Sequence, residues 1–194
     1  MDKYDTTSRK SFAGKGIFPA KYAFTLLIPI RNIFLSPKQL IQRLNLMEHF
    51  NVLEIGPGPG YFSPPLAKIL QKGTLYLLDI QQDMLDIAKK RLEKQKIRNV
   101  EYILCDGKTL DFENEYFERV LMVTVLGEVE NKIEYLREIH RILKNNGILS
   151  VSELAGDPDK LSVEELKNLV CSQGYEVDQF FGNRRNYTQN FRKI

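Results

Sequence analysis

Apolar residues follow two patterns along this chain. Short continuous runs bounded by turn residues, such as Val52 to Ile55, predict strands that are buried on both faces of a sheet. Longer stretches with apolar residues every three or four positions predict amphipathic helices. Strands are expected at 52–55, 74–80, 99–105, 117–125 and 148–153, and helices at 37–46, 61–70, 83–96, 133–143 and 163–171. This alternation predicts βα units and a parallel sheet covered by helices.

Local signals predict where several helices begin and end. The segment Ser36-Pro37-Lys38-Gln39 combines an N-cap, a proline at the first helical position and a capping-box glutamine. Ser162 and Glu165 form a second capping box. Asp83 is expected to be the N-cap of the helix at 83–96. Asn145-Asn146-Gly147 is expected to end the helix at 133–143.

The chain ends in two short strand patterns instead of a further helix. The predicted strands are Tyr175–Phe181 and Tyr187–Arg192, joined through Gly182-Asn183. A connection this short predicts a hairpin, and therefore an antiparallel pair that closes the sheet.

The most informative turn is Gly56-Pro57-Gly58-Pro59-Gly60, which follows the first buried strand. Glycines at such a strand-to-helix turn let the backbone approach a ligand, because no Cβ stands in the way. A dinucleotide-binding fingerprint requires glycines at the first, third and sixth positions. Counted from Gly56, the sixth position is Tyr61, which excludes the usual dinucleotide site.

The G-x-G-x-G spacing, with Glu54 two residues before Gly56, resembles the first motif of class I S-adenosylmethionine-dependent methyltransferases. Among these the chain is similar to the methyltransferase type 11 and ubiquinone/menaquinone methyltransferases, and the resemblance covers residues 36 to 194. It implies an α/β fold with a doubly wound, mostly parallel seven-stranded sheet, which is Rossmann-like and has an antiparallel C-terminal hairpin. The bound cofactor would be S-adenosylmethionine, with S-adenosylhomocysteine as its product.

Asp79 closes the second predicted strand, where a carboxylate can accept hydrogen bonds from both ribose hydroxyls of an adenosine. The resemblance implies that Asp106 and Gly107 contact the adenine, and that Glu54 organises the turn and interacts with the methionine amino group. Ile80 can supply apolar contact to the adenine ring. The expected cofactor-binding residues are Glu54, Gly56, Gly58, Gly60, Asp79, Ile80, Asp106, Gly107 and Thr124.

Methyl transfer from a sulfonium needs no general acid, so positioning and desolvation can supply most of the catalysis. A carbon or oxygen nucleophile also needs a base, and the segment after the fourth strand is the place to search. There Thr124 is expected to face the donor, and Glu128 is the candidate base or ammonium-binding carboxylate. The alternative for Glu128 is a structural role in helix capping.

Composition narrows the functional classes. The chain has 194 residues, 43% of them hydrophobic, which suits one core. Its two cysteines, Cys105 and Cys171, predict neither a disulfide framework nor a metal site. The longest apolar stretch, 23–35, is interrupted by Pro29 and Arg31 and is too short to span a membrane. With no signal-peptide pattern, a cytoplasmic location is expected.

Residues 1–35 form a separate segment in this interpretation. They are rich in aromatic and aliphatic residues, which must be buried somewhere. The segment is expected to fold over the carboxyl edge of the sheet, with a movable lid or membrane contact through residues 12–35 as alternatives. The domain proper is 36–194, as a monomer or dimer.

The leading hypothesis is an S-adenosylmethionine-dependent methyltransferase that acts on a small hydrophobic or amphiphilic acceptor. An RNA or protein methyltransferase is the first alternative, because basic residues gather at both ends of the chain. The segment after the fourth strand lacks the Asn/Asp-Pro-Pro-aromatic motif of base and glutamine N-methyltransferases, which argues against a nucleic-acid partner. The two remaining alternative functions are a non-catalytic cofactor-binding module and an NAD-dependent oxidoreductase.

Overall fold

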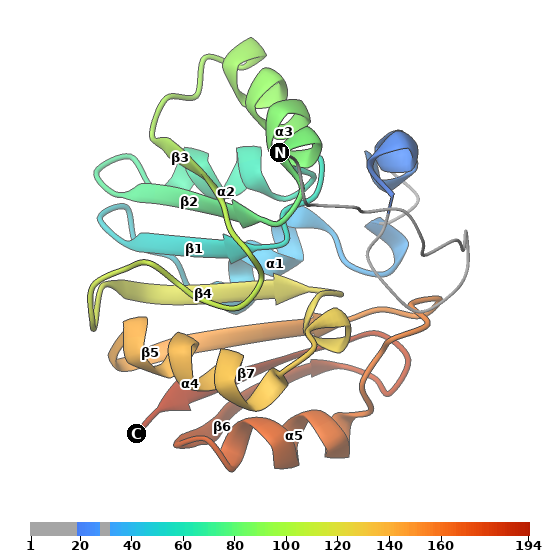
Figure 1. Ribbon diagram of the computed structural model, residues 1–194, viewed down its shortest axis with the longest axis vertical. Helices are drawn as coiled ribbons and strands as arrows, with labels where there is room; N and C mark the ends of the chain where they lie inside the picture. Colours follow the sequence, from blue (N-terminus) through green and yellow to red (C-terminus); the bar gives the residue numbers. More distant parts are fainter. Residues whose placement is uncertain (1–18, 28–31) are drawn as a thin grey trace, which may run out of the picture.

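The computed structural model describes residues 19–27 and 32–194, built around a seven-stranded sheet in the order β3-β2-β1-β4-β5-β7-β6 (Figure 1). The strands are β1 Asn51–Ile55, β2 Thr74–Asp79, β3 Val100–Leu104, β4 Phe117–Val123, β5 Leu143–Glu153, β6 Tyr175–Gly182 and β7 Tyr187–Lys193. The helices are η1 Ala20–Leu27, α1 Pro37–Leu44, α2 Ser63–Ile69, α3 Gln82–Lys94, η3 Leu126–Glu128, α4 Lys132–Ile142 and α5 Val163–Cys171.

The first five strands pair with one another in parallel, and β7 is antiparallel to both β5 and β6. The predicted mostly parallel sheet with a closing hairpin is therefore confirmed. Helices cover both faces, with α1, α2 and α3 on one side and α4 and α5 on the other (Figure 1). Each face has its own hydrophobic cluster, because strand side chains alternate. In β4, Val120 and Met122 join one cluster and Leu121 joins the other.

Both predicted capping boxes are present. The Ser36 hydroxyl oxygen accepts from the Gln39 amide, and the Gln39 side chain accepts from the Ser36 amide. Ser162 and Glu165 make the same reciprocal pair at the start of α5. Each box satisfies amides at a helix start that have no partner within the helix.

Two local predictions were wrong. The N-cap of α3 is Gln81, and Asp83 lies in the first turn, where a carboxylate is favoured by the helix dipole without capping it. Asn145-Asn146-Gly147 does not close α4, because β5 starts at Leu143 directly after the helix. The extra residues form an irregularity inside β5, with Asn146 at φ 61°.

The described part of the N-terminal segment lies at the carboxyl edge of the parallel strands. In Figure 1, η1 (dark blue) is on the side to which the arrows of β1, β2 and β4 point, and it contacts α3. The Leu26 Cδ1 atom is 3.6 Å from the position that a Cβ on Gly58 would take. Residues 1–18 and 28–31, which carry part of the predicted membrane contact and most of the predicted lid segment, lie outside the described residues. None of the described helices is long and apolar enough to cross a membrane.

Candidate active site

The glycine turn after β1 adopts a backbone conformation that favours glycine at three positions. Gly56, Gly58 and Gly60 have φ values of 64°, 53° and 72°. A Cβ on Gly56 would lie 2.5 Å from Val125 Cγ2, and one on Gly60 would lie 3.0 Å from the Ala88 Cβ. Conformation and close packing thus both explain the glycines.

Asp79 connects the end of β2 to this turn. Its Oδ2 accepts a hydrogen bond from the Gly58 amide at 3.3 Å, and its Oδ1 accepts from the Gln81 amide at 3.0 Å. The side chain is buried, and this burial raises the pKa of Asp79 above its usual value, against the opposing effect of the two amides. The predicted ribose-binding carboxylate and the predicted glycine turn therefore form one hydrogen-bonded unit.

Glu54 is buried inside β1, and Ser63 at the start of α2 provides its hydrogen-bond donor. The Ser63 hydroxyl donates to Glu54 Oε2 at 2.7 Å. Burial is the main cause that raises the pKa of Glu54 to about 7, and the nearby charge of Asp79 adds to it. Ser63 could not be predicted as the partner of Glu54, since a serine nine residues further along the chain has no distinctive spacing.

The loop after β3 brings Asp106 and Gly107 to the same edge. Asp106 Oδ1 accepts from the amides of Lys108 and Thr109 at 2.8 and 3.0 Å, which lowers the pKa of this exposed carboxyl. Its second oxygen has no such bond to the loop. A Cβ on Gly107 would lie 3.2 Å from Ile80 Cγ2, so this loop packs beside the residue that follows Asp79.

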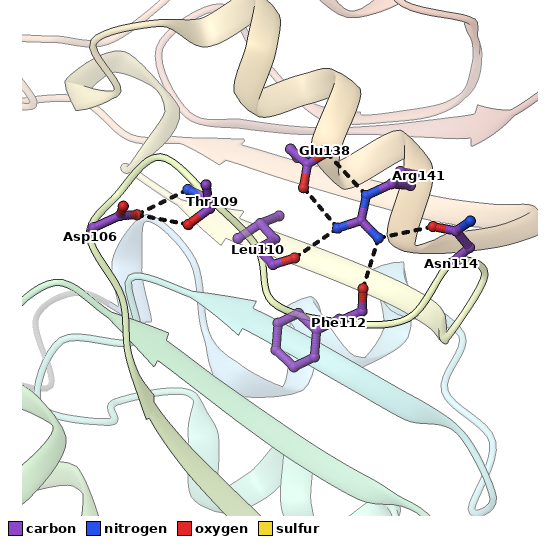
Figure 2. Close-up of polar contacts among 7 residues, drawn as sticks. All are labelled: Asp106, Thr109, Leu110, Phe112, Asn114, Glu138 and Arg141. Carbon is purple, nitrogen blue, oxygen red and sulfur yellow. Dashed lines mark hydrogen bonds and ion pairs between the residues drawn. The ribbon is translucent and has the colours of Figure 1, made fainter.

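Arg141 on α4 fixes the path of that loop, as Figure 2 shows. Its Nη1 donates to the Phe112 carbonyl at 2.7 Å and to Asn114 Oδ1 at 2.9 Å. Its Nη2 donates to the Leu110 carbonyl at 2.7 Å and to Glu138 on its own helix. A planar guanidinium with five donors suits this role. This role of Arg141 could not be predicted from the sequence, because its backbone carbonyl partners leave no sequence pattern.

The segment after β4 holds the two candidate catalytic residues. Thr124 has φ 56°, and its hydroxyl donates to the Val123 carbonyl at 2.7 Å. Glu128 lies in η3, where burial and the charges of Asp157, Asp159 and Asp79 raise its pKa to about 7. The N-cap of α4 is Asn131, whose side chain accepts from the Glu134 amide. Helix capping is therefore not the role of Glu128.

Comparison with known proteins places this geometry in a family. A family model described as "Methyltransferase domain" matches residues 53–151, just over half of the chain. The chain belongs to this methyltransferase family. The matched part contains the glycine turn, Asp79, Asp106 and Glu128, so the predicted resemblance to class I S-adenosylmethionine-dependent methyltransferases is confirmed.

Curated relatives of this methyltransferase include ubiquinone/menaquinone biosynthesis C-methyltransferases UbiE. The protein of Coxiella burnetii (strain Dugway 5J108-111) is 28% identical over 106 residues, which are 54% of this chain and 42% of that protein. The protein of Francisella tularensis subsp. novicida (strain U112) is 30% identical over 120 residues, 61% of this chain and 48% of that one. The matches thus span about half the length of these relatives.

Solved structures show the same fold. An S-adenosylmethionine-dependent methyltransferase from Aquifex aeolicus has a TM-score of 0.85 at 20% identity, covering 92% of this chain and 100% of that one. A putative methyltransferase of the same class from Methanococcus maripaludis has a TM-score of 0.74 at 20% identity, covering 95% and 98%.

The residues present suit the cofactor that the family uses. The glycines of the turn let the amino-acid end of S-adenosylmethionine approach its backbone, and the Asp79 carboxylate can accept hydrogen bonds from ribose hydroxyls. The Ile80 side chain is 40% exposed beside them and offers an apolar surface to a flat ring. No group of acidic, histidine or cysteine side chains within residues 19–27 and 32–194 is arranged to hold a metal ion.

We predict that Gly56→Ala will weaken S-adenosylmethionine binding at least about ten-fold and destabilise the protein by ~1–3 kcal/mol. The new Cβ would combine a left-handed φ with a clash against the stiff, β-branched Val125. Gly156→Ala is the matched control, because Gly156 has φ 93° but no atom within 4 Å of its Cβ position. Titration calorimetry and urea unfolding of both variants measure the difference, and equal effects of the two would contradict the role of the Val125 contact.

Arg141→Met is expected to raise the dissociation constant for S-adenosylhomocysteine by roughly ten-fold, since the hydrogen bonds to the Leu110 and Phe112 carbonyls and to the Asn114 side chain are lost. Amide hydrogen exchange in residues 106–112 should accelerate at the same time. Arg137→Met is the control on the same helix, because Arg137 is exposed and donates to the Gln173 side chain, away from the loop. Unchanged exchange in Arg141→Met would contradict the positioning role.

Glu54→Gln is expected to flatten the pH dependence of stability. The pKa of Glu54 is about 7 in the folded protein against an ordinary 4.5, so the folded state holds the proton more tightly. The contribution of Glu54 to the free energy of unfolding therefore falls between pH 4.5 and 7 and stays level above that range. Between pH 5 and 8 the variant should lose ~1–3 kcal/mol less than the wild type. Urea unfolding at both pH values tests this, with the exposed Glu113→Gln as a control that behaves like wild type.

Proposed function

We propose that this protein transfers a methyl group from S-adenosylmethionine, by in-line displacement, to a small hydrophobic or amphiphilic acceptor. The observation that carries the proposal is the hydrogen bond between the Gly58 amide and the Asp79 carboxylate. It unites the predicted amino-acid-binding turn and the predicted ribose-binding carboxylate at the carboxyl edge of the sheet, where ligands of open α/β sheets bind.

The cofactor, when bound, supplies a methyl group on a positively charged sulfur. In this proposal Asp79 binds the ribose, the turn at 56–60 receives the amino-acid end, and Asp106 with Gly107 and Ile80 encloses the adenine. Glu54 stays hydrogen-bonded to Ser63 and keeps the turn in position. Thr124 lies at the end of β4 beside the reacting centre, where its backbone is fixed by the bond from its amide to the Ser152 carbonyl. Positioning of this kind lowers the barrier of a two-reactant step.

Glu128 is the residue proposed to accept a proton from the acceptor. Its pKa of about 7 suits a general base at neutral pH, because such a group is partly ionised and still basic enough to take a proton. It is half-buried and lies next to the end of β4, so a small molecule entering beside Thr124 would reach it.

The apolar nature of the acceptor is supported by the described part of the N-terminal segment. Leu26 faces the glycine turn, and Phe24 on the same short helix is 65% exposed. The UbiE relatives are named for ubiquinone and menaquinone biosynthesis, so the acceptors of the matched proteins belong to a hydrophobic chemistry. We infer that the described part of this segment, residues 19–27 and 32–35, covers the acceptor and helps to exclude water from the reacting groups.

The decisive experiment is calorimetric titration of the full chain with S-adenosylmethionine and S-adenosylhomocysteine. Asp79→Asn should weaken both by roughly 10- to 100-fold, because hydrogen bonds to a charged carboxylate are worth ~1.5–3 kcal/mol each. Asp83→Asn, an exposed aspartate in the first turn of α3, should leave both affinities within about two-fold of wild type. Absence of binding in the wild type, or equal affinities in the two variants, would disprove the proposed cofactor site.

A further inference from the structure

A group of acidic side chains lies beyond the ends of β4 and β5, next to the proposed cofactor site. Glu128 belongs to η3, Glu153 is the last residue of β5, and Asp157 follows in the next loop. The two segments that carry them are in close contact, since a Cβ on Gly127 would lie 2.0 Å from the Asp159 carbonyl oxygen. Both segments are on the side of the sheet to which the parallel strands point (Figure 1).

Glu153 is a fully buried carboxylate without a proper partner. Its exposed fraction is 0%, and neither of its carboxylate oxygens makes a hydrogen bond of normal geometry with a described residue. The Leu161 amide is near enough only to favour the charged form slightly. Tyr187 pairs with Glu153 across the two strands, but its hydroxyl donates to the Leu161 carbonyl at 2.7 Å instead. A buried carboxylate without a hydrogen-bond donor or a positive charge beside it lowers stability, unless a ligand supplies one.

The charge of Lys160 acts to lower the pKa of Glu153 and of Asp157, but its ammonium forms no ion pair with either of them among the described residues. Its ammonium donates to the carbonyls of Arg184 and Arg185 at 2.7 and 2.6 Å and lies 5.5 Å from the Tyr187 ring centre. In the described ranges, Glu128, Glu153 and Asp157 take part in no ion pair. Glu128, Glu153 and Asp157 therefore have no cationic partner within the described residues, while the Lys160 ammonium is hydrogen-bonded to the backbone of another loop.

The pKa values of Glu128, Glu153 and Asp157 agree with their burial and with their closeness to one another. Burial is the largest cause that raises the pKa of Glu153 to about 8 and that of Glu128 to about 7, and the charge of Asp157 raises both further. Burial also raises the pKa of Asp157. A positive charge that entered the site would lower the pKa of each of these groups and favour its ionised form.

We propose that Glu128, Glu153 and Asp157 form a binding site for an organic ammonium group carried by the methyl acceptor. An organic cation is favoured over a metal ion, because no described group of acidic side chains has the arrangement that a metal requires. The inference rests on the proposed methyl transfer and narrows its acceptor to amphiphiles that join an apolar part to an amine or a quaternary ammonium. The apolar part would lie toward Leu26 and Phe24, and the cation toward the end of β5.

The test compares two probes of almost equal shape, 2-phenylethylamine and 2-phenylethanol. Both are titrated into the full chain saturated with S-adenosylhomocysteine. The charged amine should bind at least about ten-fold more tightly, and this preference should vanish in Glu128→Gln and Glu153→Gln. Glu130→Gln removes the same charge from an exposed residue two positions beyond Glu128, and it should keep the preference.

A third probe, phenyltrimethylammonium, keeps its charge at every pH. Its affinity should rise several-fold between pH 6 and 9 as the acidic group ionises, while Tyr187 stays protonated because burial raises its pKa. The other charged groups that act on this site are Asp79, Asp159 and Lys160. If Glu153→Gln does not fold, Asp157→Asn replaces it, with the same loss of preference expected.

Three outcomes would overturn the proposal. The first is equal binding of amine and alcohol, or binding of neither at millimolar concentration. The second is a preference that persists in both glutamine variants. The third is weaker S-adenosylhomocysteine binding in those variants, which would show that the acidic group serves the positive charges of the cofactor. In the first two cases, intact cofactor binding that depends on Asp79 would leave the proposed methyl transfer standing.

Discussion

The bond between the Gly58 amide and the Asp79 carboxylate is the contact on which the rest of the site depends. It joins the end of β2 to the turn that leaves β1, two parallel neighbours at the centre of the sheet. The three glycines allow the turn to reach that position, and Ser63, Ala88 and Val125 pack around it. Because the turn lies in so narrow a space, its geometry is set before any ligand arrives, which is the preorganisation that binding and catalysis need.

The same edge of the sheet concentrates unfavourable negative charge. The pKa values of Glu54, Asp79, Glu128, Glu153 and Asp157 are all raised, with burial as the largest cause in every case. Groups of like charge at low solvation reduce stability above neutral pH. Perturbed carboxyl groups gathered in this way are typical of functional sites, where stability is given up for binding. A positively charged ligand is the natural complement of this edge.

The support around the site comes from elements far away in the sequence. Arg141 on α4 holds the loop after β3 through its carbonyls, and α4 is in turn packed by the hydrophobic cluster that includes β4 and β5 (Figure 2). The terminal hairpin contributes in a similar way, since Tyr187 on β7 pairs with Glu153 on β5 and the Asn186 side chain accepts from the Ala155 amide. The last two strands thus complete the sheet and also shape the acidic group beyond β5.

The sequence by itself determined the order of strands and helices, the capping boxes, the hairpin and the turn at 56–60, because these depend on short-range patterns of burial, backbone conformation and side-chain capping. Its errors were local as well. Asp83 has the chemistry of an N-cap but stands inside the first turn, and Asn145–Gly147 forms an irregularity of β5 instead of the end of α4. Only the tertiary structure decided which partner each buried carboxylate has. Ser63 serves Glu54, two amides serve Asp79, and Glu153 is left without a normal partner, because such pairings depend on distances between segments that no spacing along the chain records.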